Sequence, residues 1–128
     1  MPKHTQDRPK LGPIFRYWQR RLGLENWKIW YRYTSPEQLG NDRCGAIVLT
    51  RHIQEASISI LDPKEANKAD RPNLDVEETV VHELVHIHID PFFQGETRAD
   101  VCLEEWAVVA LSKALVQEHR ASRRKPQH

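Results

Sequence analysis

The chain has 128 residues, a formal net charge of +1 at pH 7 and 29% charged side chains. This length fits one domain that can bury a core without disulfides or metal ions. A net charge so close to zero gives no reason to expect nucleic acid as a partner. A membrane partner is not expected either, because no apolar run approaches a length of about 18 residues.

The two ends of the chain differ in composition from its middle. Residues 1–12 are polar, contain prolines and lack the apolar run of a secretory signal, so a flexible segment and a cytoplasmic protein are expected. A phage protein that leaves the cell by lysis would also need no secretory signal, so this route of release stays open. Residues 119–128 are basic without apolar periodicity, which predicts a solvated tail. The domain is therefore expected to span residues 13–118.

The first half of this domain predicts a helix followed by strands. Residues 14–21 have an apolar stripe at helical spacing, and Gly23 is expected to end that helix. Residues 27–33 and 56–60 alternate between apolar and polar side chains, and residues 45–50 form a β-branched run. Three strands, or four, predict a small antiparallel or mixed sheet with one covered and one open face.

The second half predicts two helices, which makes the fold class α+β. Apolar side chains recur at helical spacing over residues 74–89, with Asp75 and Glu78 as a capping box and Asp90-Pro91 as the stop. A second long helix is expected over residues 97–118. Four tryptophans and two cysteines are predicted to be buried packing residues, with both cysteines reduced: Trp18, Trp27, Trp30, Trp106, Cys44 and Cys102.

The first of these two helices carries the motif His82-Glu83-Leu84-Val85-His86. Residues four apart on a helix lie on one face, so both imidazoles can reach one metal ion, and Zn²⁺ accepts imidazole nitrogen readily. Glu83 then lies beside the metal, where a general base for a bound water is needed. Chance would produce this pattern roughly 0.03 times in such a chain. A purely structural histidine pair is disfavoured because it would interrupt the apolar helix face.

The third metal ligand is expected to be a carboxylate. A His-Glu-x-x-His-x-x-Gly-x-x-His pattern is excluded, because Ile89 and Phe92 stand where Gly and His are required. His88 lies on a different side of the helix and is interpreted as a partly exposed residue. Helical projection places Glu104 within the inward apolar stripe and Glu105 toward its edge, so Glu104 is the favoured ligand. Glu105 stays open as the alternative ligand or as an acceptor for a ligand histidine.

These residues resemble the gluzincin metallopeptidases, in which a glutamate on a second helix follows the His-Glu-x-x-His helix. The small size makes the chain similar to the minimal members, the minigluzincins and related phage or bacterial zincin-like proteins. The resemblance covers about residues 22–116. It implies a zincin-like fold, a Zn²⁺ cofactor and hydrolysis of peptide bonds. It also implies that His82 and His86 are zinc ligands, Glu83 the general base and Glu104 the third ligand.

In this family the last strand before the motif helix forms the sheet edge that holds an extended peptide or protein substrate. The resemblance therefore implies that the backbone of Ser57, Ile58 and Ser59 binds the substrate by β-augmentation. Larger gluzincins stabilise the oxyanion with a His or Tyr from a following subdomain, and this chain has almost nothing after its second helix. The available donors are Tyr31, Tyr33, His52 and His119.

Two other functions remain open at this point. The sequence shows few groups that could stabilise an oxyanion, which is compatible with a zinc-containing binding or regulatory module that has little or no turnover. An iron oxygenase with two histidines and one carboxylate is less favoured, because that chemistry does not require a glutamate directly after the first ligand.

Overall fold

The computed structural model describes residues 8–40, 43–66, 74–93 and 97–124. Its helices and strands in chain order are α1 (Leu11–Arg21), β1 (Lys28–Thr34), α2 (Pro36–Leu39), β2 (Gly45–Thr50), β3 (Glu55–Leu61), α3 (Val76–Ile89) and α4 (Arg98–Arg124). Short 3-10 turns are η1 (Arg51–Ile53), η2 (Pro63–Glu65) and η3 (Asp90–Phe92). Within the described residues, no helix combines the length and the apolar character that crossing a membrane requires.

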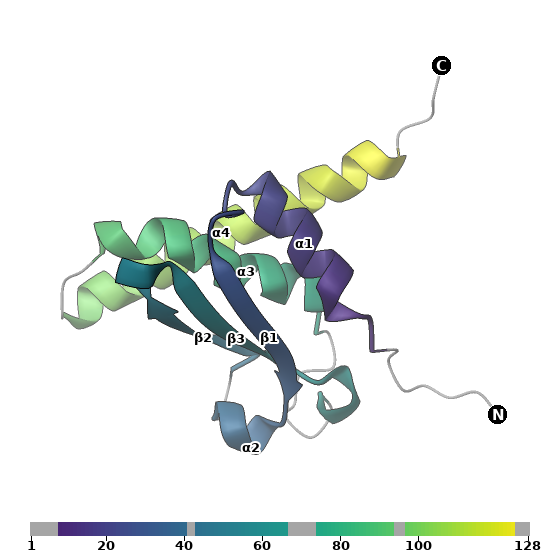
Figure 1. Ribbon diagram of the computed structural model, residues 1–128, viewed down its shortest axis with the longest axis horizontal. Coiled ribbons are helices and arrows are strands. Elements are labelled where there is room, and N and C mark those ends of the chain that lie inside the picture. The colour runs from purple at the N-terminus through teal and green to yellow at the C-terminus, as the bar shows by residue number, and fades with distance from the viewer. Residues whose placement is uncertain (1–7, 41–42, 67–73, 94–96, 125–128) are drawn as a thin grey trace.

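The three strands form one mixed sheet in the order β1-β3-β2, and this small sheet with its helices confirms the predicted α+β class (Figure 1). Strand β1 pairs with β3 in parallel and β2 pairs with β3 antiparallel, so that Ile58 lies between Tyr31 and Ile47. The expectation that residues 56–60 form the sheet edge is therefore wrong. Their backbone hydrogen-bonding groups are shared with two neighbouring strands, and the edge strand on the β2 side is β2 itself.

The helices cover one face of this sheet. Ala56, Ile58 and Ile60 point inward and are buried, whereas Ser57 between them is exposed, which confirms one covered and one open face. Helices α1 and α3 pack on the covered face, and α4 packs against α3 (Figure 1). The hydrophobic core lies between these layers.

Helix α3, which carries the motif, begins and ends as its sequence predicts. The Asp75 carboxylate caps the helix by accepting the Glu78 backbone N–H at 3.0 Å. The helix ends at Ile89, directly before Asp90-Pro91, because proline offers no backbone N–H to continue it. The position of the motif on a helix is thus a consequence of local sequence.

Both ends of the domain extend further than predicted. Helix α1 begins at Leu11, which is buried, inside the segment that was expected to be flexible. Helix α4 continues to Arg124, so the predicted tail is helical as far as that residue; His119 and Arg120 are half-buried, residues 121–124 are exposed as expected, and residues 125–128 lie outside the described part. The extension is stabilised by contacts with the rest of the fold. His119 Nδ1 lies 3.0 Å from the Tyr17 hydroxyl, and Arg120 donates to Asp75 at 2.8 Å and 2.9 Å.

The prediction that all four tryptophans are buried is wrong for two of them. Trp18 is 1% exposed and Trp27 packs against the core, but Trp30 is 50% exposed and Trp106 is 72% exposed. Trp30 pairs with Ser57 in the sheet and therefore shares its open face. The cysteines are both unpaired, as expected, but Cys44 is only half-buried and Cys102 is exposed. Single apolar runs do not reveal which side of a strand or helix faces the core.

Candidate metal centre

Helix α3 brings the two motif histidines together. His82 and His86 lie one turn apart, with ring centroids 5.1 Å from each other and the ring planes steeply inclined. Neither ring is fully buried, with side chains 21% and 16% exposed, so each can be reached from the adjacent cavity. The four-residue spacing on a helix explains this arrangement completely.

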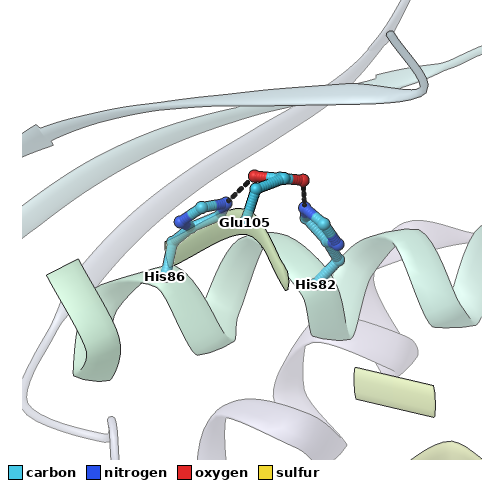
Figure 2. Close-up of side chains that lie close together, drawn as sticks. All are labelled: His82, His86 and Glu105. Atoms are coloured by element: carbon cyan, nitrogen blue, oxygen red, sulfur yellow. Dashed lines mark ion pairs between the residues drawn. The ribbon is translucent and has the colours of Figure 1, made fainter. Parts of the chain in front are cut away.

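The Glu105 carboxylate, from α4, lies between the two imidazoles (Figure 2). One of its oxygens is 2.9 Å from His82 Nε2 and the other is 3.3 Å from His86 Nε2. One ligand atom from each of the three residues lies within 4.8 Å of the other two. The three side chains therefore converge on one point, although 19 residues separate Glu105 from the nearer histidine.

Glu104 occupies a different position from the one expected. Its carboxylate accepts a hydrogen bond from His86 Nδ1 at 2.9 Å, on the side of the ring away from Glu105. Helical projection correctly indicates that it is the more buried glutamate, since its side chain is 14% exposed and that of Glu105 is 54% exposed. The partner that accommodates its buried charge is an imidazole N–H, however, so the geometry favours Glu105 as the third ligand.

This contact sets the orientation of the His86 ring. When Nδ1 carries the proton and donates it to Glu104, Nε2 is left free to donate its lone pair to a metal ion. Carboxylates that support ligand histidines in this way fix the ring and increase its basicity. Glu104 therefore fixes the His86 ring, and Glu105 is the carboxylate that lies between the two imidazoles.

The charges of the cluster favour a cation at this point. Burial lowers the pKa of His86, but hydrogen bonds with Glu105 and Glu104 outweigh burial and raise the pKa to about 9. Hydrogen bonds with His82 and His86 lower the pKa of Glu105. Two carboxylates against two imidazoles stabilise positive charge, whether a proton or a metal ion carries it.

The Glu83 side chain faces the same cavity and has unusual surroundings for a carboxylate. The residue is 5% exposed and makes no hydrogen bond with any other described residue. Burial raises its pKa, and the nearby charges of His82 and His86 oppose that shift. No described side-chain oxygen is both sealed from solvent and unpaired, so the Glu83 carboxylate reaches the cavity, and a carboxylate with a shifted pKa in a cavity is a candidate functional group.

Gly45, at the start of β2, allows Glu83 to occupy this position. A Cβ atom built on Gly45 would lie 2.8 Å from Glu83 Oε2 and 3.0 Å from Thr79 Cγ2. The edge strand therefore passes directly over the carboxylate. No sequence motif marks this glycine, and only its place at the start of a β-branched run could have drawn attention to it.

The chemistry of the three converging side chains suits a divalent metal ion, because two imidazole nitrogens and a carboxylate are ligands that Zn²⁺ accepts. Glu105 contacts the two imidazoles through different oxygens, at 2.9 Å and 3.3 Å. Neighbouring ligand atoms in a tetrahedral zinc site lie about 3.3 Å apart, so the three side chains, whose ligand atoms lie within 4.8 Å of one another, would close in slightly around an ion. His88 does not belong to the cluster, since its Nε2 donates to the Leu22 carbonyl at 2.6 Å.

A cavity of about 540 Å³ opens beside the cluster, and it differs from the expected substrate site. It is lined by Arg43, Cys44, Gly45, Ala46, Ile47, Glu78, Thr79, His82, Glu83, His86 and Glu105. Neither the strand residues 57–59 nor any of the four expected oxyanion donors lines it.

Comparison of the chain with protein-family models, with curated proteins and with solved structures found no match.

Proposed function

We propose that the chain is a zinc-dependent peptidase whose domain is a minimal, zincin-like fold of the gluzincin type. The observation that carries this proposal is the convergence of His82, His86 and Glu105 within 4.8 Å, next to the buried Glu83. Two imidazoles and one carboxylate are a ligand set of catalytic zinc sites, which leave a position for water or substrate. Bound zinc would supply a Lewis acid that acidifies water and polarises the scissile carbonyl.

Glu83 is the residue that moves protons in this proposal. Its carboxylate accepts a proton from the attacking water and afterwards delivers it to the nitrogen of the departing amine. Burial raises the pKa of Glu83, which brings it closer to neutral pH, where a group can both accept and release a proton. The neighbouring Glu104 takes no part in this transfer and holds His86 in position.

An extended peptide is the substrate class that the site would accept, bound along β2 instead of β3. Strand β2 pairs with one neighbour in the described sheet, so its second edge is available for β-augmentation. Gly45, Ala46 and Ile47 of this strand line the cavity beside Glu83. A peptide paired with β2 would therefore lie directly against the base and the metal ligands.

One observation favours the second candidate, a zinc-containing binding module with little or no turnover. None of the side chains expected to stabilise an oxyanion lines the cavity in the described part of the chain. Tyr33, for example, donates its hydroxyl to the Pro9 carbonyl at 2.6 Å. Loss of one oxyanion donor typically costs about 10²- to 10³-fold in kcat.

The test compares zinc content and peptide cleavage in the parent, Glu83→Gln and Glu78→Gln. Glu78 is a matched control because it lies on the same helix and lines the same cavity but pairs with Lys113 at 3.0 Å. We expect all three proteins to bind zinc, and cleavage to fall about 10²- to 10⁴-fold in Glu83→Gln alone. Cleavage retained by zinc-loaded Glu83→Gln would remove Glu83 from the mechanism. Metal-dependent peptide binding without cleavage by the parent would favour the binding module.

A further inference from the structure

Arg43 adds a positive charge to the cavity that holds Glu83 and the metal-ligand cluster. It lies just before β2, and the pairing of that strand extends to Cys44, whose carbonyl accepts the Leu61 N–H at 2.8 Å. The paired backbone next to Arg43 therefore anchors its position at the rim of the cavity. Apart from the histidines, Arg43 is the only basic side chain among the described residues that line the cavity.

The Arg43 guanidinium has no partner within the described part of the chain. It forms no hydrogen bond or ion pair there, whereas Glu78 is neutralised by Lys113 and Glu105 lies against two imidazoles. Arg43 is nevertheless close enough to Glu83 to act on it: burial raises the pKa of Glu83, and the Arg43 charge is one of those that lower it. Among the described residues, an unpaired guanidinium thus lies beside the proposed base.

We propose that Arg43 binds a carboxylate of the peptide substrate close to the scissile bond, an inference that rests on the proposed peptidase function. The planar guanidinium donates two parallel N–H bonds that match the two oxygens of a carboxylate. Arg43 is an exposed residue that lines the cavity, so water partly screens this pair. The carboxylate belongs either to an acidic side chain or to the C terminus of the peptide.

The test measures peptide binding to the full chain loaded with zinc, with Glu83→Gln in every protein to prevent turnover. The probes are fluorescein-labelled pools of randomised eight-residue peptides, and binding is followed by fluorescence anisotropy. In the first set of paired pools, one fixed position carries glutamate in one pool and glutamine in the other, and the fixed position moves along the peptide from pair to pair. A second pair has a free or an amidated C terminus. The two pairs separate an acidic side chain from the terminal carboxylate.

We expect one pair of pools to show about tenfold tighter binding of the carboxylate form, as for a charge-assisted hydrogen bond that is partly screened by water. Arg43→Ala should abolish this preference and Arg43→Lys should retain part of it. Arg32→Ala is the matched control, because Arg32 is an exposed arginine on β1 that does not line the cavity, and the preference should persist.

The outcomes also separate this inference from the proposed function. Peptide binding with no carboxylate preference, or with a preference that survives in Arg43→Ala, overturns the role of Arg43 alone. Absence of binding in every pool overturns both proposals. In the parent enzyme, Arg43→Ala should raise KM for the preferred peptides with little change in kcat. A fall in kcat at constant KM would instead place Arg43 at the transition state and contradict the proposal.

Discussion

Gly45→Ala should disturb Glu83 through a steric contact that can be calculated from the structure. The added Cβ would lie 2.8 Å from Glu83 Oε2, 3.0 Å from Thr79 Cγ2 and 3.2 Å from the Ser59 carbonyl oxygen, whereas ordinary contacts lie at 3.4–4 Å. Thr79 cannot turn away easily, because its hydroxyl donates to the Asp75 carbonyl at 2.8 Å. Either β2 shifts or the Glu83 carboxylate is displaced.

The expected cost is about 1–2 kcal/mol in the free energy of unfolding. Overpacking a close contact costs about 1–3 kcal/mol, and replacing a glycine stabilises by about 0.4–1 kcal/mol because the unfolded chain loses freedom. The backbone contributes no strain, since Gly23 and Gly40 are the described glycines with positive φ. Urea unfolding of metal-free protein, followed by circular dichroism, measures the change without the contribution of bound metal.

A double-mutant cycle identifies the source of this cost. In a Glu83→Ala background the close carboxylate is absent, so Gly45→Ala should cost about 1 kcal/mol less than in the parent. Gly12→Ala is the control, because its Cβ would approach Arg16 and Tyr31 side-chain ends at 3.2 Å in a helix that favours alanine. If Gly45→Ala leaves stability and peptide cleavage unchanged, the close approach of β2 to Glu83 is refuted.

Two further predictions concern the contacts of α4 with α3. Glu105→Ala should weaken zinc binding more than Glu104→Ala, for which a loss of about 10- to 100-fold is expected from removal of the His86 Nδ1 acceptor. Competition with a chelating dye measures both, and the reverse order would restore Glu104 as the ligand. Asp75→Ala should lower the free energy of unfolding by about 1–2 kcal/mol, because the helix cap and the Arg120 pair are lost together. The Arg120 hydrogen bond lowers the pKa of Asp75 below its ordinary 3.8, so this contribution is complete above about pH 4 and disappears as the pH falls further. Urea unfolding at a series of pH values should therefore show the parent and Asp75→Ala converging in acid, and a constant difference would contradict the assignment.

The features that the sequence predicts correctly are those that neighbouring residues determine. The cap at Asp75, the stop at Asp90-Pro91 and the four-residue spacing of His82 and His86 involve no distant part of the chain. Each follows from helix geometry and from the hydrogen-bonding groups that a helix end leaves open. These contacts were therefore open to prediction before the fold was known.

The order of the strands could not be predicted in the same way. Alternation in residues 56–60 indicates that one face of the strand is buried, but it contains no information about which strands lie on either side. The structure places β1 and β2 on both sides of β3, so the edge that lies over Glu83 comes from an earlier segment. The expected sheet edge was misplaced for this reason. The sequence analysis gave no attention to Arg43 and Gly45, which line the cavity, for the same reason.

The choice between Glu104 and Glu105 as the third ligand stays a prediction, and the geometry now favours Glu105. Helical projection ranks residues by burial, and Glu104 is indeed the more buried of the two. A metal ligand in a catalytic site must also be open to the substrate cavity, and the exposed Glu105 meets that requirement. Burial alone therefore does not separate a carboxylate that supports a histidine from one that faces the cavity.

The contacts along α4 determine how this helix is rotated against α3. Arg120 pairs with Asp75 near one end of the interface between α3 and α4, and the two glutamates meet His82 and His86 at the other. Apolar and small side chains pack between these polar contacts: Val108, Ser112 and Val116 are buried. Packing that continues between two polar contacts fixes the rotation of α4, and a rotation of about 100° per residue separates Glu104 from Glu105. The position of Arg120 in the sequence therefore helps to determine which glutamate lies between the two histidines.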